Sequence, residues 1–205
     1  MRAETVRDQA LAVSGLLSPR MFGSPVYPPN PVKVVQPAFQ AAVHWKTSAG
    51  EDRYRRALYT YLQRSSPHPL FDTFDMASRS VCSLRRLPSN TPLQSFYTLN
   101  DEQFVEAAQA LARRMITGGG SDPAARLRFG FKAVTLRDPQ PDEVATLAEL
   151  YQDRLAHYQQ AQGDALQMAT QPIGPLPQDV TAPDAAAMTV VANVLLNLDE
   201  FLNLP

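Results

Sequence analysis

Residues 100–120, NDEQFVEAAQALARRMITGGG, decide the fold class of this chain. Apolar residues recur there at steps of three and four, the period of an amphipathic α-helix that is buried on one side. The residues on that side are Phe104, Ala107, Ala108, Leu111 and Met115. Asn100 can cap the first turn, and the three glycines from Gly118 can end the last. The stretch therefore predicts a helix that Asn100 caps and that runs through Ile116.

Similar patterns on either side predict further helices, separated by prolines. We expect helices over 3–17, 51–64, 92–99, 123–134, 141–158 and 184–202. The helix over 92–99 should open with a capping box, in which Thr91 is the cap and Gln94 the third helical residue. No strand-period alternation of useful length is found. The predicted fold class is therefore mainly α: an irregular multi-helix domain with a long proline-rich extended arm near the N-terminus.

Two proline-bearing stretches lie outside these helices. Residues 18–38 contain six prolines, which exclude a regular helix. They also contain apolar residues, which favour an arm wrapped over the core rather than a flexible linker. Residues 171–183 are polar and are predicted to be a weakly ordered linker before the last helix. In that helix Asn193 and Asn197 are one turn apart within an apolar seam. If they are buried, their amides must be hydrogen-bonded.

Composition excludes several classes of function. The formal net charge of −1 argues against a dedicated nucleic-acid or membrane-surface protein, so neither partner is expected. There is no apolar run of membrane-spanning length, and the N-terminal residues do not form a signal peptide. The single cysteine, Cys82, permits no intrachain disulfide and no CxxCH haem attachment. We therefore expect no cofactor in this chain.

Positive charge gathers between Arg53 and Arg86. That interval holds seven arginines against Asp72 and Asp75, a balance of +5, so the rest of the chain must sum to −6. Several guanidinium groups close together would bind carboxylate, sulfate or phosphate. The alternative is structural: solvated helix arginines, with Arg85 and Arg86 pairing the two aspartates to brace a loop. The structural alternative is favoured, because ion-pair networks of this kind are common.

Cys82 has three interpretations: a buried apolar residue, a nucleophile activated by nearby arginines, or a metal ligand. The first is favoured, because cysteine is among the most buried residue types. A nucleophile would need a base, and His68 is the only histidine close in sequence. No pair of histidines has zinc-ligand spacing, so no metal is expected. The catalytic candidates are therefore Asp75 and Cys82. The candidates for binding an anion or ligand are Arg79, Arg85, Arg86, Asn90 and Gln94.

The sequence resembles a known family over nearly its whole length. In the region 74–101 the resemblance rests on Phe74, Asp75, Arg79, Cys82, Arg85, Arg86, Asn90, Thr91, Pro92, Leu93, Gln94, Asn100 and Asp101. Further matching segments are 3–17, 23–29, 136–143 and 190–205. Together they resemble the C-terminal planctomycete-specific domain of unknown function found in planctomycete cytochrome C domain-containing proteins. Members of that group also carry an N-terminal cytochrome c module, which this sequence lacks.

The resemblance implies a setting for the chain. Residues 1–205 would be one helical domain, the C-terminal part of a larger multidomain protein that is exported to the periplasm or cell envelope. Haem c would belong only to the missing module, and the other domains of the parent protein would be partners. We expect a non-catalytic module that acts as a scaffold or binds an anionic or carbohydrate ligand. The alternative is a fragment of an enzyme for oxidative or hydrolytic processing of polysaccharides, including sulfated ones.

Overall fold

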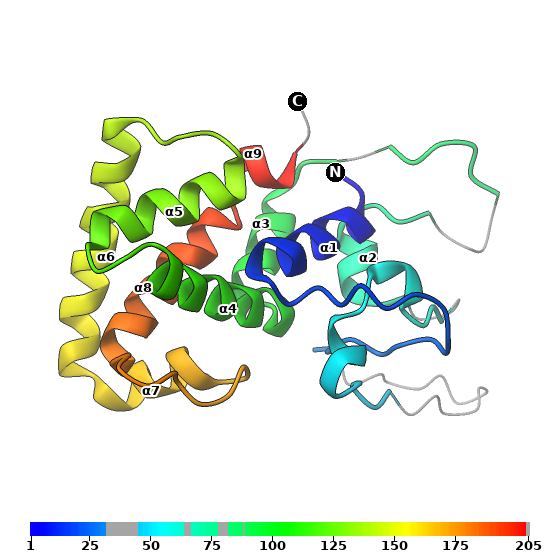
Figure 1. Ribbon diagram of the computed structural model, residues 1–205. Coiled ribbons are helices and arrows are strands. Elements are labelled where there is room, and N and C mark those ends of the chain that lie inside the picture. The colour runs from blue at the N-terminus through cyan, green and yellow to red at the C-terminus, as the bar shows by residue number, and fades with distance from the viewer. Residues whose placement is uncertain (32–44, 64–66, 78–81, 88, 204–205) are drawn as a thin grey trace.

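Figure 1 shows the computed structural model, which describes residues 1–31, 45–63, 67–77, 82–87 and 89–203. Across these residues the elements are α-helices and two short 3-10 helices, and only isolated β-bridges form. They are α1 (Ala3–Ser14), η1 (Gly50–Tyr54), η2 (Ala57–Tyr59), α2 (Pro69–Thr73), α3 (Pro92–Asn100), α4 (Glu102–Gly118), α5 (Pro123–Thr135), α6 (Pro141–Gln160), α7 (Gln162–Thr170), α8 (Ala182–Leu195) and α9 (Asp199–Leu202). The predicted mainly α fold class is confirmed.

The core is built around α4 and α8, which pack against each other more extensively than any other pair of described elements. Helices α6 and α7 cover α8, while α1, α3 and α5 pack on α4. Both central helices bury apolar side chains along most of their length, which supplies most of the stabilisation of a helical domain. The first and last helices also meet, because Gln9 Nε2 on α1 donates to the carbonyl of Phe201 on α9 at 3.1 Å.

Helix α4 follows the predicted pattern with one difference at its start. Its five predicted core residues are buried, and the glycine run ends it as expected. The cap, however, is Asp101, whose side chain accepts a hydrogen bond from the backbone N–H of Gln103 at 3.0 Å. Asn100 instead completes α3, where its side chain donates to the Phe96 carbonyl. The chain therefore turns one residue later than predicted.

The predicted last helix is interrupted. The chain leaves α8 after Leu195 and enters α9 at Asp199, with extended backbone at Leu198. Asn197 fixes this break: its Oδ1 accepts from Thr98 Oγ1 at 2.9 Å, and its Nδ2 donates to the Ser95 carbonyl at 3.2 Å. Asn193 Nδ2 likewise donates to a carbonyl of α3. Asn197 is thus hydrogen-bonded through both ends of its amide, whereas Asn193 is bonded through Nδ2 and its buried Oδ1 has no partner among the described residues. These bonds hold α3 against the end of α8.

The predicted helix over 51–64 is wrong. Residues 50–54 and 57–59 form two separate 3-10 helices, and burial does not follow the polarity of the side chains: Arg55 is 2 % exposed, whereas Leu58 is 68 % exposed. Side chains of α1 form hydrogen bonds with the backbone groups that a helix would bond internally. Arg7 donates to the carbonyls of residues 53 and 55, and Asp8 Oδ1 accepts from the Ala57 N–H at 2.6 Å. These long-range hydrogen bonds replace those of a regular α-helix in this segment.

The described part of the proline-rich arm, residues 18–31, runs beside this segment without helix (Figure 1). Val26 pairs with it in a parallel bridge, donating to the Tyr59 carbonyl and accepting from the Tyr61 N–H, both at 2.8 Å. Residues 32–38 of the predicted arm lie outside the described residues. At the other end of the chain, the predicted linker 171–183 is contacted by α4. There Gln109 Nε2 donates to the carbonyls of Met168 and Gln171, both at 2.7 Å.

Candidate functional site

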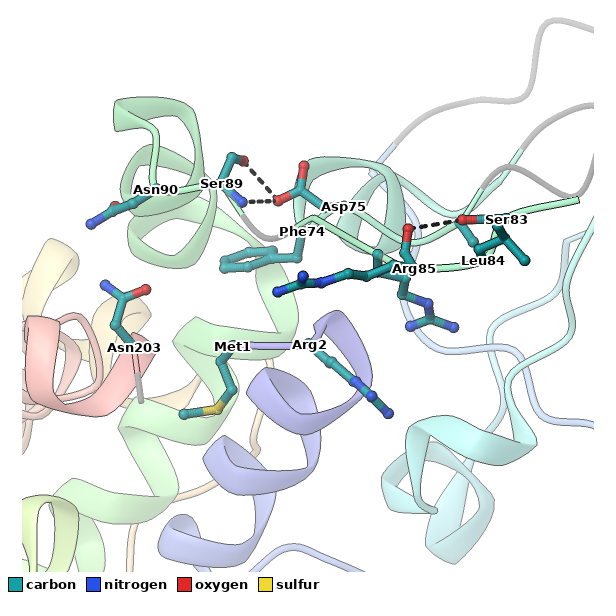
Figure 2. A pocket seen from close by; sticks show the side chains of 12 residues that line it. Met1, Arg2, Phe74, Asp75, Ser83, Leu84, Arg85, Ser89, Asn90 and Asn203 are labelled. Atoms are coloured by element: carbon teal, nitrogen blue, oxygen red, sulfur yellow. Dashed lines mark hydrogen bonds between the residues drawn. The ribbon is translucent and has the colours of Figure 1, made fainter. Parts of the chain in front are cut away.

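A groove of about 830 Å³ lies where the start of α1 faces the connection between α2 and α3 (Figure 2). The residues that line it are Met1, Arg2, Phe74, Asp75, Ala77, Ser83, Leu84, Arg85, Arg86, Ser89, Asn90 and Asn203. Four of the predicted site residues are in this lining: Asp75, Arg85, Arg86 and Asn90. Met1, Arg2 and Asn203 come from distant parts of the sequence, and sequence reasoning missed them. We call this feature the arginine groove.

Asp75 follows the end of α2 and has a left-handed backbone, with φ of 56°. One carboxylate oxygen accepts from the Ser89 N–H at 2.6 Å and from the Ser89 hydroxyl at 2.7 Å (Figure 2). The same oxygen also accepts from Gln94 Nε2 at 3.5 Å. Asp75 therefore links the end of α2 to Ser89 and to Gln94 in the first turn of α3. The sequence alternative had Arg85 or Arg86 bracing this loop through Asp72 or Asp75. That pairing is wrong: Asp75 accepts from Ser89 and Gln94, Arg86 pairs with Glu4, and within the described residues no ion pair joins either arginine to Asp72.

Gln94 lies behind the groove rather than in its lining. The predicted capping box is confirmed: the Gln94 side-chain oxygen accepts from the Thr91 N–H at 3.2 Å. Its amide donates to the Thr73 carbonyl at 3.0 Å and to the Ser89 hydroxyl at 3.2 Å. With its side chain buried and committed to these partners, Gln94 positions Asp75 and Ser89. Asn90 differs, since it is exposed and lines the groove.

The three groove arginines have different surroundings. Arg86 donates to both carboxylate oxygens of Glu4 at 2.9 Å, and each side chain is about a third exposed. Arg2 and Arg85 are exposed, and neither guanidinium has a hydrogen-bond or ion-pair partner within the part of the chain that the structure describes. Two uncommitted cations thus lie beside a paired one in the same groove. Arg79, the remaining predicted anion ligand, lies outside the described residues.

Cys82 is exposed, so the prediction that it is a buried apolar residue is wrong. It precedes two further exposed residues, Ser83 and Leu84, in a segment that no helix covers. It is not part of the groove lining, whereas its neighbour Ser83 is. The thiol and the Asp75 carboxylate are therefore not both presented to the groove.

His68 is committed elsewhere and cannot serve Cys82 as a base. It is buried, with Nε2 donating to the Pro29 carbonyl at 2.8 Å and Nδ1 accepting from the Leu70 N–H at 3.3 Å. Burial lowers the pKa of His68 to about 4, so the ring is neutral at physiological pH. Gln103 donates to the same carbonyl at 3.2 Å. His68 therefore fastens the proline-rich arm to α2, beside α4.

A buried arginine, Arg7, contacts Gln103, the residue that shares the Pro29 carbonyl with His68. Arg7 on α1 is 2 % exposed and donates to Gln103 Oε1 at 2.8 Å, to the Arg55 carbonyl at 2.5 Å and to the Arg53 carbonyl at 2.9 Å. Burial lowers the pKa of Arg7 to about 10, which still leaves it charged. We refer to Arg7, Gln103, His68 and the Pro29 carbonyl as the polar centre. Its partners are 39 to 96 residues apart in sequence, and for that reason no local pattern indicated it.

Most arginines of the +5 interval prove to be structural. Arg53 pairs with Glu106 at 2.8 Å and with Glu102 at 2.7 Å. Arg55 donates to the carbonyls of residues 22 and 24 and stacks over the Tyr59 ring at 4.0 Å. Arg56 lies 3.5 Å from Asp8. Arg64 lies outside the described residues. Within the described part of the interval, only Arg85 lacks an internal partner.

The described residues contain no group of three histidine, cysteine or acidic side chains that could hold a metal ion. Nor does any helix among them have the length and apolar character needed to cross a bilayer.

The fold and the groove define a helical domain with an exposed cationic recess. Residues 1–151 match the model of the family described as PSD1: Protein of unknown function (DUF1553). The match covers well over half of the chain, so the chain belongs to this family, and the domain of unknown function expected from the resemblance is confirmed at that level. No curated protein and no solved structure matched the chain. The matched range ends within α6, although the central helix α8 lies beyond it.

Proposed function

We propose that this domain is a non-catalytic binding module that holds an anionic ligand or partner in the arginine groove. One observation carries the proposal: Arg2 and Arg85 line the same groove, and neither has a partner in the described structure. The other described arginines of the N-terminal half are tied to carboxylates or carbonyls: Arg20 lies 3.4 Å from Asp52, and the rest are paired as shown above. Guanidinium groups are weakly hydrated and bind carboxylate, sulfate or phosphate with two parallel hydrogen bonds.

The rest of the lining suits a ligand that also carries hydroxyl or amide groups. Asn90 presents a side-chain amide, which both donates and accepts hydrogen bonds, and Asn203 presents an amide whose Nδ2 already donates to Asp199. Ser83 adds a hydroxyl oxygen that can accept, since the hydroxyl already donates to the Arg85 carbonyl at 3.0 Å. An acidic carbohydrate or an acidic region of another domain would both match this combination of charge and neutral polar groups.

We further propose that the module works beside other domains of an exported, cytochrome c-linked protein in the periplasm or cell envelope. The support for this setting is the resemblance of the 74–101 motifs and of the four other segments. Haem would then be held by another module, and this chain would contribute binding. A pull-down of the native protein that recovers no haem-containing polypeptide, either fused or associated, would contradict this setting.

The enzymatic alternative, processing of sulfated polysaccharides with Asp75 and Cys82, has less support. One Asp75 oxygen already accepts three hydrogen bonds, and Cys82 lies outside the groove lining without an available histidine. A general base or nucleophile must reach the reacting atom and be activated by its neighbours. For these reasons we propose binding as the function.

The test is calorimetric titration at low salt with a heparin-derived hexasaccharide and with inorganic sulfate. Arg85→Ala removes one uncommitted guanidinium, and Arg128→Ala on α5 is its matched control, because Arg128 is also exposed and has no partner in the described structure. A charge-assisted hydrogen bond contributes about 1.5–3 kcal/mol, so Arg85→Ala should weaken binding about tenfold or more. Arg128→Ala should not weaken it. Equal binding by both variants would contradict the proposal.

A further inference from the structure

A second pocket, of about 420 Å³, adjoins the arginine groove between α1, η2 and α2. Arg2 and Arg86 line both recesses, so the two are neighbours on one continuous surface. Together they exceed the volume of roughly 1,000 Å³ at the upper end of small-molecule sites. The surface is therefore large enough for a ligand that extends from one recess into the other.

The second pocket is lined by charged and apolar side chains in similar number. Leu58, Leu62, Phe71 and Met76 contribute to its lining, and Leu58 is 68 % exposed. In the arginine groove Leu84 is fully exposed beside Arg85. Clustered apolar side chains of this kind, bordered by charged residues, are typical of surfaces that contact another molecule.

The uncommitted charge of this surface is positive. Its acids are already engaged: Glu4 binds Arg86, Asp8 accepts from the Ala57 N–H and lies 3.5 Å from Arg56, and Asp75 accepts from Ser89 and Gln94 as described above. Arg2, by contrast, lines both recesses without a partner in the described structure. A complementary ligand would bring carboxylates for the arginines and aliphatic groups for the pocket.

We propose that the occupant of the two recesses is an acidic peptide segment with apolar side chains, supplied by another protein or domain. Its carboxylates would contact Arg85 and Arg2, and its aliphatic side chains would contact Leu58 and its neighbours. This inference rests on the proposed function and names the partner. A sugar acid would use the arginines equally well, but it has few apolar groups to place against Leu58. A peptide supplies both kinds of group at short spacing.

The test measures fluorescence anisotropy of labelled octapeptides at low salt. The main probe alternates aspartate and leucine; one control peptide replaces aspartate by serine, and the other replaces leucine by glycine. The variant that isolates this inference is Leu58→Ser, which removes an exposed apolar group of the second pocket. Its matched control is Leu166→Ser on α7, where the leucine is 55 % exposed. Arg85→Ala and Arg128→Ala complete the set.

We expect the aspartate–leucine peptide to bind about tenfold more tightly than either control peptide. Arg85→Ala and Leu58→Ser should each weaken its binding several-fold, while the two control variants should leave it unchanged. If Arg85→Ala weakens binding but Leu58→Ser does not, the peptide inference is overturned and the anion groove stands. If the heparin-derived hexasaccharide binds about tenfold more tightly than the peptide, a sugar is the occupant and the inference is likewise overturned. If no anionic probe binds, the proposed function fails as well.

Discussion

Replacing Arg7 by methionine should be among the most destabilising single changes in this protein. The guanidinium is 2 % exposed and donates to three oxygen atoms: Gln103 Oε1 and the carbonyls of Arg55 and Arg53. Methionine keeps much of the apolar stem but leaves these three acceptors without their donor. Each buried acceptor that loses its partner costs about 1–3 kcal/mol. Removal of an unfavourably buried charge offsets part of this, since burial already lowers the pKa of Arg7.

We therefore expect Arg7→Met to lower the free energy of unfolding by about 3 kcal/mol. In a chain of this size that corresponds to about 6–12 °C in melting temperature. The matched control is Arg56→Met, where the side chain is 48 % exposed and lies 3.5 Å from Asp8. An exposed pair of this kind contributes about 1 kcal/mol or less.

The assay is urea unfolding followed by far-ultraviolet circular dichroism, with thermal melts in the same buffer. Both variants should unfold with the slope of the wild type, so that the midpoints report stability directly. If Arg7→Met unfolds within about 1 kcal/mol of the wild type, as the control should, then the polar centre does not hold α1 in place. The account of why residues 51–61 are not helical would then fail too.

Three further predictions test other parts of the structure. His68 has a pKa lowered to about 4 by burial, below the ~6.5 of an unfolded histidine, so the unfolded state binds the extra proton between these values. Stability should fall by up to about 3 kcal/mol as the pH drops from ~6.5 to ~4, and His68→Gln should flatten this slope in a series of urea midpoints. Glu4→Gln frees Arg86 from its ion pair, which should cost about 1 kcal/mol or less in stability. Inorganic sulfate, titrated by calorimetry, should then bind several-fold more tightly. Unchanged sulfate affinity would argue against Arg86 as a ligand. Gly119→Ala would place a Cβ 2.5 Å from the Arg126 Cα and should lower the melting temperature by several degrees. Gly163→Ala is the control, because its Cβ would meet nothing within 4 Å, and it should raise the melting temperature slightly. Equal melting temperatures for the two variants would contradict the packing at residue 119.

Local sequence patterns predicted the helical fold class well where the deciding interactions are local. The cap at Thr91 and its partner Gln94 are three residues apart, and the apolar face of α4 repeats within one helix. The helix expected over 51–64 failed because distant groups take its backbone hydrogen bonds. Arg7 and Asp8 act there from more than 45 residues away. A prediction made from neighbouring residues alone cannot include these distant hydrogen-bond partners.

The candidate site, like the fold, was predicted where its residues are close in sequence and missed where they are distant. Asp75, Arg85, Arg86 and Asn90 lie within sixteen positions of one another, and the structure places all four in one groove. Their role in binding a ligand stays a prediction. The sequence did not indicate that Arg2 would join them, or that Glu4 would pair with Arg86, because α1 reaches the groove only through tertiary packing. Whether a given arginine is free or committed depends on such contacts.

The hydrogen bond from Gln9 to Phe201 has a consequence for how the protein is made. The two residues are 192 positions apart. At about 5–20 residues per second, the ribosome needs about 10–40 s to add the second after the first. During that interval α1 has only some of its final neighbours, since Gln103 also follows Arg7 by 96 residues. The apolar side of α1 packs mainly on α4, so it stays uncovered until the ribosome has added α4, and the bond to Phe201 forms later still. In the first of these intervals a chaperone can bind that side of α1.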